Sequence, residues 1–285
     1  MSTVSGTSQI FSSRISTSRI FTRATIEVPD GGRVEYGRSG AVNGAHVVFV
    51  HGWPDSWKSF QPVMDSLPDE FSATSVSLAG FGGSDAIASP ARPSDLARSV
   101  IALCDALDIE RAVFVGHSLG TLVCQRLAER RPDLVRGLVL IGAFAYIPAD
   151  LADELRSIVA PITDPMDDAF IREFQASTLA APVPTDFFET LISESLRAPA
   201  AVWRATVAGM RADHSDGPVG ITVPTLLIWG DQDGLALRDQ QERLLAVLPS
   251  ARLEVYADAG HSPNWEQPAR VADDIAQLVQ AHNGV

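Results

Sequence analysis

Short apolar runs rich in β-branched residues alternate with amphipathic segments along most of the chain. The runs predict strands at residues 46–50, 72–78, 112–116, 137–142, 225–229 and 252–257. Several runs are apolar without alternation, as expected of parallel strands that are covered on both faces. Amphipathic helices are predicted between them, at residues 93–107, 121–130, 237–248 and 268–280. This alternation predicts a doubly wound α/β fold with a mostly parallel sheet, and a ligand site beyond the carboxyl ends of the strands.

A helical insertion is predicted between the strands at residues 137–142 and 225–229. Residues 146–216 contain no convincing strand, only helical patterns interrupted by prolines. We expect this segment to form a lid over the active edge of a core made of residues 25–145 and 217–285. Its apolar side chains are candidates for the walls of a substrate pocket: Phe174, Phe187, Phe188, Leu191, Trp203 and Met210.

The N-terminal segment differs in composition from the rest of the chain. Residues 1–26 contain no Asp or Glu, many Ser and Thr, and the arginines Arg14, Arg19 and Arg23. This composition is also found in transit-type leaders, but the apolar residues are too sparse for a secretory signal. We therefore expect residues 1–24 to form an N-terminal arm, and a homo-oligomer in which the arm packs against a second subunit is a hypothesis.

The charge of the chain excludes two classes of partner. A formal net charge of −13 and a pI near 4.8 would repel both the phosphates of nucleic acid and an anionic membrane surface. No apolar run approaches the roughly 20 residues needed to span a bilayer. Cys104 and Cys124 lie within apolar helical patterns, which fits buried thiols in a reducing, cytoplasmic setting. We expect a small-molecule substrate.

The sequence VFVGHSLGT, residues 113–121, carries the first chemical signal. Its G-x-S-x-G motif follows a predicted strand and precedes a predicted helix, which is the context of a nucleophile elbow. The turn strains the backbone of Ser118, and the flanking glycines avoid clashes with the neighbouring strand and helix. Because Gly and Ser are common in turns, the motif alone is only moderately specific.

A serine hydroxyl needs a base within hydrogen-bond reach, and that base needs a third group to orient it. The sequence supplies both groups downstream of Ser118, each directly after a predicted strand. His261 is the predicted base. Asp231 and Asp233 both follow the strand at 225–229; Asp233 is our choice for the acid, and Asp231 is the alternative.

The oxyanion hole is predicted from two backbone N–H groups. The first belongs to Leu119, directly after the nucleophile, and the second to Trp53 in the loop HGWPD, because Pro54 has no N–H to donate. His51 is expected to bond the backbone of this loop, and Asp55 to cap the next helix.

These motifs together identify a family resemblance. From about Thr25 to the C-terminus the chain resembles the α/β-hydrolase superfamily, because HGWPDSW, LAGFGGSD, GHSLG, GDQD and DAGHSPNWEQP occur in the family's order. The resemblance implies the α/β-hydrolase fold with a helical lid. Many members carry an Asp or Glu just before the segment LAGFGGSD, where this chain has Ser77; the difference concerns loop packing more than chemistry.

The resemblance also narrows the chemistry. HGWPDSW looks like the corresponding loop of epoxide hydrolases, but those enzymes and the haloalkane dehalogenases use an aspartate where this chain has Ser118. Serine-using relatives are carboxylesterases and lactonases, cofactor-free haloperoxidases that act as perhydrolases, and carbon–carbon bond hydrolases. We predict hydrolysis of a carboxylic ester or lactone of a small hydrophobic substrate through an acyl-enzyme, with no metal or cofactor. A perhydrolase, a carbon–carbon bond hydrolase and a ligand-sensing hydrolase relative are the alternatives.

Overall fold

The computed structural model describes residues 21–29, 32–213 and 217–281. One sheet of eight strands has the order β1-β2-β4-β3-β5-β6-β7-β8. The strands are β1 (Thr22–Val28), β2 (Gly32–Gly40), β3 (Ala45–Val50), β4 (Phe71–Val76), β5 (Ala112–His117), β6 (Val135–Ile141), β7 (Thr225–Gly230) and β8 (Ala251–Tyr256). Strands β3 to β8 pair in parallel, whereas β2 pairs antiparallel with both β1 and β4. The six predicted strands are β3 to β8; the alternation had not identified β1 and β2.

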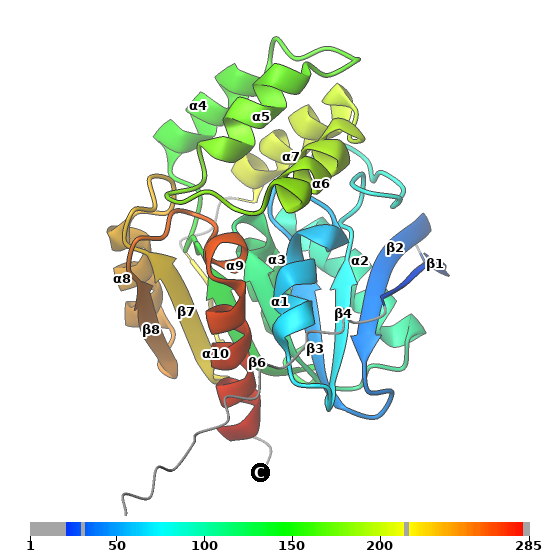
Figure 1. Cartoon of the computed structure of the whole chain (residues 1–285), viewed down its shortest axis with the longest axis vertical. Coiled ribbons are helices and arrows are strands. Elements are labelled where there is room, and N and C mark those ends of the chain that lie inside the picture. Colours follow the sequence, from blue (N-terminus) through cyan, green and yellow to red (C-terminus); the bar gives the residue numbers. More distant parts are fainter. Residues whose placement is uncertain (1–20, 30–31, 214–216, 282–285) are drawn as a thin grey trace, which may run out of the picture.

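Helices cover both faces of this sheet (Figure 1). One face carries α1 (Gln61–Ser66), α9 (Pro263–Glu266) and α10 (Pro268–Ala281), and the other carries α2 (Pro93–Ala106), α3 (Leu119–Arg130) and α8 (Arg238–Val247). A short 3-10 helix, Trp57–Phe60, precedes α1. Strand β3 shows no alternation of apolar and polar residues because its alternate residues enter two separate cores: Val47 and Phe49 pack with α10, and Val48 and Val50 pack with α2 and α3. The fold is that of a doubly wound α/β protein.

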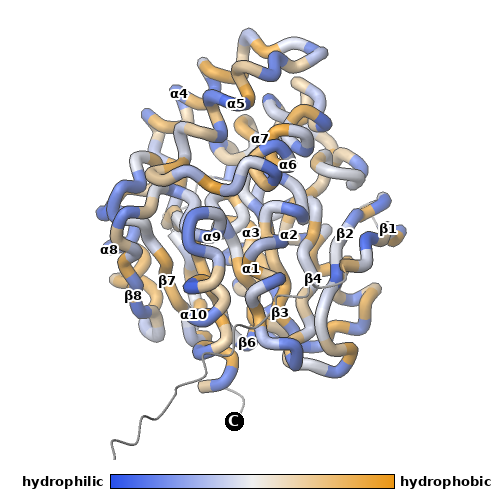
Figure 2. Tube along the Cα trace, in the orientation of Figure 1, coloured by the Kyte–Doolittle hydropathy of each residue, from blue (hydrophilic) through white to orange (hydrophobic). Residues whose placement is uncertain are grey.

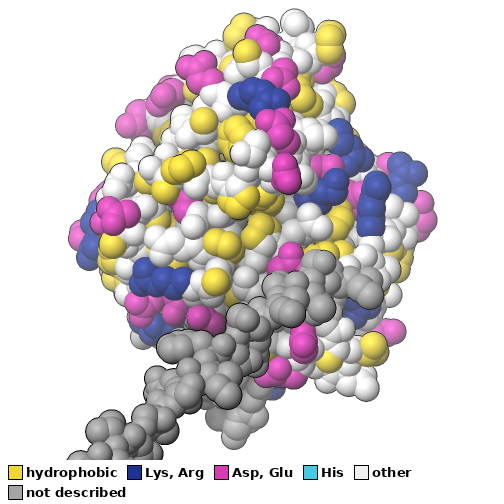
Figure 3. All heavy atoms as spheres, in the orientation of Figure 1, with side chains coloured by type: hydrophobic (Ala, Val, Ile, Leu, Met, Phe, Trp, Pro, Cys, Tyr) yellow, Lys and Arg dark blue, Asp and Glu magenta, His cyan; other side chains and the backbone are white. Residues whose placement is uncertain are grey.

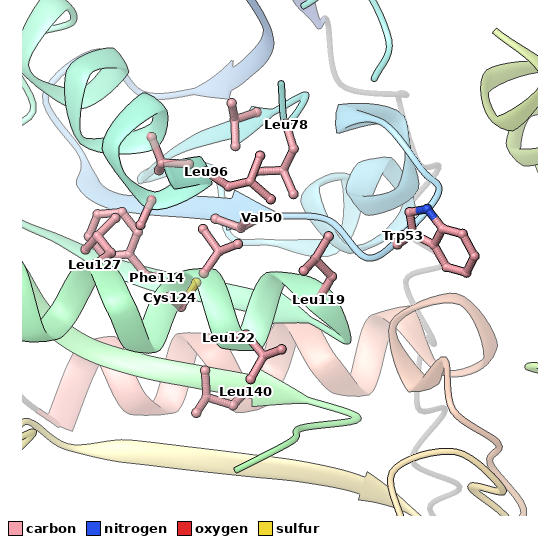
Figure 4. Packing of buried hydrophobic residues seen from close by; sticks show 14 of the residues in the cluster. Val50, Trp53, Leu78, Leu96, Phe114, Leu119, Leu122, Cys124, Leu127 and Leu140 are labelled. Atoms are coloured by element: carbon pink, nitrogen blue, oxygen red, sulfur yellow. The ribbon is translucent and has the colours of Figure 1, made fainter. Parts of the chain in front are cut away.

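The core on the α2 and α3 side contains aliphatic side chains and Phe114, several of which are labelled in Figure 4. Cys104 of α2 and Cys124 of α3 lie in this core as free, buried cysteines. Figure 4 also shows Trp53 set apart from the other labelled residues, on the loop that follows β3. Apolar packing thus fixes the β3, β5 and α3 elements, from whose ends the candidate site is built.

Four helices lie between β6 and β7: α4 (Ala149–Val159), α5 (Asp168–Ala176), α6 (Thr185–Leu196) and α7 (Ala200–Ala212). Figure 1 shows them gathered at one end of the sheet, and Figure 2 shows hydrophobic and hydrophilic stretches alternating along α4 and α5. We call residues 149–212 the insertion; positions 214–216 of the predicted span lie outside the described residues. Polar contacts tie the insertion to the core, among them an ion pair of 2.8 Å between Lys58 and Glu194.

The N-terminal prediction is only partly within the described residues. Positions 1–20 lie outside them, and Thr22–Ala24, expected in the arm, belong to β1, where they pair with β2. Within the described ranges no helix is long and apolar enough to cross a membrane. On the face seen in Figure 3, acidic and basic side chains are interspersed.

Candidate active site

Ser118 lies in the sharp turn between β5 and α3. Its backbone has φ 50° and ψ −117°, a left-handed conformation that is strained for a residue with a side chain. The close approach of the neighbouring elements explains the two glycines of the motif: a β-carbon on Gly116 would collide with the carbonyl of Gly120, and one on Gly120 with the carbonyl of Val50. The turn leaves Ser118 half-buried, with its side chain at the wall of a cavity.

Asp233 and His261 come together at the ends of β7 and β8. The His261 Nδ1 atom lies 2.9 Å from Oδ2 and 3.1 Å from Oδ1 of Asp233. Both side chains are buried, and Asp233 Oδ1 also accepts the N–H groups of Leu235 and Ala236. A carboxylate in this position selects the imidazole tautomer with its proton on Nδ1, which leaves Nε2 able to accept a proton. Nε2 is buried and has no hydrogen-bond partner within the described part of the chain.

The alternative acid, Asp231, has a different role. Its side chain is exposed, and Oδ1 accepts the N–H of Asp258 in the turn after β8. The geometry therefore favours Asp233 as the partner of His261.

The loop after β3 lies directly against Ser118. A β-carbon added to Gly52 would lie 3.2 Å from Ser118 Cβ and 2.8 Å from His117 Nδ1, so only glycine allows this approach. The next residue, Trp53, lines the same cavity as Ser118. Leu119 is the first residue of α3, so its N–H has no partner inside the helix. Both residues that are predicted to supply the oxyanion donors, Trp53 and Leu119, therefore line the same cavity as Ser118.

Two further histidines support the site without taking part in an acid–base pair. His51 Nδ1 donates to the Gly52 carbonyl at 2.6 Å, and its Nε2 accepts the Leu78 N–H at 2.8 Å. Burial lowers the pKa of His51 to about 4, so it remains neutral. His117 Nε2 donates to the carbonyl oxygen of His261 at 3.0 Å. The structural role expected of His51 agrees with these bonds, and His117 lies beside His261 and bonds its backbone.

A cavity of about 170 Å³ joins these groups beneath the insertion. Ser118, His261, Trp53 and Leu119 line it from the core. The walls are mainly apolar and come from both parts of the chain: Phe144, Ile147, Leu235 and Trp265, together with Leu151, Leu155, Ile158, Phe174 and Met210 of the insertion. A small substrate with an apolar portion fits these walls.

The chain matches the family model described as alpha/beta hydrolase fold over residues 45–268. It belongs to the α/β-hydrolase family. The fold, the order of the motifs and the strained serine are those that the sequence led us to expect.

This α/β hydrolase is similar to several named esterases. A pimeloyl-[acyl-carrier protein] methyl ester esterase of Neisseria meningitidis serogroup B is 32% identical over 227 residues, which span 76% of this chain and 86% of that protein. A thermophilic esterase from Thermogutta terrifontis is 27% identical and superimposes with a TM-score of 0.77 over 92% of this chain and 100% of that one. A 2-hydroxy-6-oxononadienedioate/2-hydroxy-6-oxononatrienedioate hydrolase from Pseudomonas sp is 27% identical over 82% of this chain and 86% of that protein.

The six insertion residues proposed for the pocket of this hydrolase have different positions. Phe174 and Met210 line the cavity. Phe188 lines a separate groove with residues 179–183, and Phe187 packs edge-on to Trp265. Trp203 is fully buried behind the cavity wall, where its ring contacts Trp53 and Phe174, and Leu191 is also buried. None of these last four is among the residues that line the cavity.

Sequence reasoning missed the contribution of α4 to the cavity. Leu151, Leu155 and Ile158 follow the i, i+4, i+7 spacing of one helix face, a signal that could have identified them. It also assigned Asp55 wrongly, as a helix cap. Ser56 caps the helical turn at residues 57–60 by accepting the Lys58 N–H, while Asp55 faces the cavity and accepts a hydrogen bond from Gln175.

Proposed function

We propose that this α/β hydrolase is a serine esterase that cleaves a carboxylic ester or lactone of a small, largely apolar substrate through an acyl-enzyme. The observation that carries the proposal is the convergence, in one apolar cavity, of the strained Ser118 and of His261 hydrogen-bonded to the buried Asp233. The similarity to proteins named as esterases supports the same conclusion.

In the first half of the reaction Ser118 attacks the carbonyl carbon of the ester. His261 Nε2 accepts the hydroxyl proton and later delivers it to the departing alkoxide, while Asp233 holds the ring and stabilises the imidazolium. The N–H groups of Trp53 and Leu119 stabilise the negative charge on the tetrahedral oxygen, and each such donor contributes roughly 3 to 4 kcal/mol in other enzymes. In the second half, water activated by His261 cleaves the acyl-enzyme.

Two alternative activities use the same serine, histidine and aspartate. A perhydrolase would replace the water with hydrogen peroxide and release a peracid. A carbon–carbon bond hydrolase has support from the similarity to the Pseudomonas protein, whose name describes a dioate substrate. No Lys or Arg is found among the described residues that line the cavity, and Asp55 and Glu154 border it, so its charge does not favour a dianion.

The deciding experiment compares wild type with Ser118→Ala on a panel of short p-nitrophenyl esters and lactones, with and without peroxide. We expect hydrolysis by wild type, a loss of at least about 10⁴-fold in the variant, and labelling of Ser118 alone by a fluorophosphonate, located by mass spectrometry. No ester turnover together with no label at Ser118 would reject the proposal, and ligand-dependent capture of a partner without turnover would favour a sensor. Halide oxidation that requires peroxide and acetate would favour the perhydrolase.

A further inference from the structure

Asp55 places a carboxyl group at the cavity, and the proposed mechanism gives that group no role. The residue is 2% exposed and lines the same cavity as Ser118 and His261. Its Oδ1 atom accepts a hydrogen bond of 2.9 Å from Gln175 Nε2. Among the described residues, hydrogen bonding to the Asp55 carboxyl group involves Oδ1, and no bond to the other oxygen, Oδ2, is found. A molecule in the cavity can therefore meet a polar atom whose hydrogen-bonding capacity is unused.

Gln175 holds this carboxyl group in place from the side of the insertion. Gln175 is 1% exposed, and its Nε2 atom donates to both Asp55 Oδ1 and Ser195 Oγ, each at 2.9 Å. Ser195 Oγ in turn donates to the carbonyl of Leu191 at 2.9 Å. Because both amide hydrogens are used, the carboxyl group is oriented before any ligand arrives, and ligand binding need not order it.

The chemistry of the site limits what the free oxygen can bind. Burial raises the pKa of Asp55 to about 7, against the opposing effects of the Gln175 hydrogen bond and of the electrostatic interaction with His261. Near neutral pH the group is therefore present both as carboxylate and as carboxylic acid. A hydroxyl group can pair with either form, because it donates to the carboxylate and accepts from the acid. An anionic substituent would be repelled by the carboxylate, and a cation would have to leave water for apolar walls.

We propose that Asp55 is a substrate-binding residue whose free carboxyl oxygen hydrogen-bonds a hydroxyl group of the ester, so that the preferred substrates are hydroxy esters. The inference rests on the proposed esterase function and adds the substrate class. The hydroxyl belongs to either the acyl or the alcohol part of the ester, and the test distinguishes the two.

The test uses two pairs of esters in which a hydroxyl replaces a methyl group of similar size. Methyl 3-hydroxybutyrate and methyl 3-methylbutyrate differ in the acyl part, while 2-hydroxyethyl butyrate and propyl butyrate differ in the alcohol part. Acid release in a pH-stat gives kcat/KM for each ester. The measured quantity is the ratio of hydroxy ester to its methyl counterpart, because intrinsic reactivity cancels when that ratio is compared between protein variants.

Asp55→Leu removes the polar group at nearly constant shape, and Asp55→Asn retains a partner for Gln175. The double variant Asp55→Leu, Gln175→Met replaces both hydrogen-bonding groups and guards against misfolding caused by an unpaired buried amide. Ser195→Ala is the control, because it removes the other partner of Gln175 without touching the cavity.

We expect the ratio for one pair to fall by about ten- to hundredfold in Asp55→Leu and in the double variant, to fall less in Asp55→Asn, and to stay at the wild-type value in Ser195→Ala. The pair that responds identifies the part of the ester that carries the hydroxyl.

Unchanged ratios for both pairs, or an equal change in Ser195→Ala, would overturn the proposal. Loss of both esters of a pair in equal measure, with Ser118 still labelled by a fluorophosphonate, would also overturn it, because Asp55 would then serve every substrate. Failure of wild type on all four esters without labelling would reject the esterase function itself.

Discussion

The imidazole of His261 and the carboxyl group of Asp233 meet at 2.9 Å although the two residues lie 28 positions apart in the chain. Each residue follows the carboxyl end of a strand, and β7 and β8 pair in parallel, so both loops leave the sheet at the same edge. The parallel pairing of β7 and β8 therefore brings the two side chains together.

Asp233→Asn should retain the fold but reverse the hydrogen bond to His261, because an amide can donate to Nδ1 and so favour the wrong imidazole tautomer. We expect kcat for a p-nitrophenyl ester to fall by about 10³- to 10⁴-fold. Asp231→Asn is the matched control, since the Asp231 carboxyl group accepts the Asp258 N–H in the turn after β8, and should keep activity within about threefold. The reverse pattern would show that Asp231 is the acid.

Gly52→Ala should impair the oxyanion loop. The new β-carbon would press on Ser118 Cβ and His117 Nδ1 and displace the neighbouring N–H of Trp53. A misplaced oxyanion donor costs about 10²- to 10³-fold in kcat, with a smaller effect on KM. Gly234→Ala is the comparison, because an added β-carbon there meets nothing within 4 Å. Equal kinetics of the two alanine variants would argue against this position for the oxyanion hole.

The buried Asp55 predicts a pH-dependent stability. Its pKa is about 7 in the folded chain and near its ordinary value of 3.8 when unfolded, so the folded state binds the proton more tightly. The free energy of unfolding should therefore fall as pH rises from about 4 to about 7, by about 4 kcal/mol in total from this group. Urea unfolding of wild type and Asp55→Asn at several pH values measures the difference between them. Parallel pH curves for the two proteins would contradict the prediction.

Phe174 and Phe188 provide a test of the cavity walls. Phe174 lines the cavity, whereas Phe188 lines a separate groove. Phe174→Ala should enlarge the cavity and shift the optimum of kcat/KM toward longer acyl chains, changing the relative rates of acetate and hexanoate esters by about tenfold. Phe188→Ala should leave the chain-length profile as it is in wild type. A shift in Phe188→Ala and not in Phe174→Ala would show that the acyl chain binds in the groove at Phe188, contrary to the prediction.

The sequence by itself determined the layered core and the order of the chemical groups. Apolar runs without alternation specify strands covered on both faces, and the glycines beside Ser118 specify a turn that few other residues permit. These properties are local, so they can be recognised in short stretches of sequence. Strands β1 and β2 were missed because polar residues interrupt the apolar pattern by which the other strands were recognised.

Only the tertiary structure shows that Asp233, and not Asp231, lies against His261, because both aspartates follow β7 and the contact depends on where the loop after β8 places His261. The packing of the insertion likewise decided that α4 lines the cavity while Trp203 lies buried behind it. The position of Asp55 also depends on tertiary contacts. Ser56 caps the helical turn that follows, and the Asp55 carboxyl group is held by Gln175, 120 positions away in the chain. Contacts between segments so distant in the chain leave no periodic trace in its sequence.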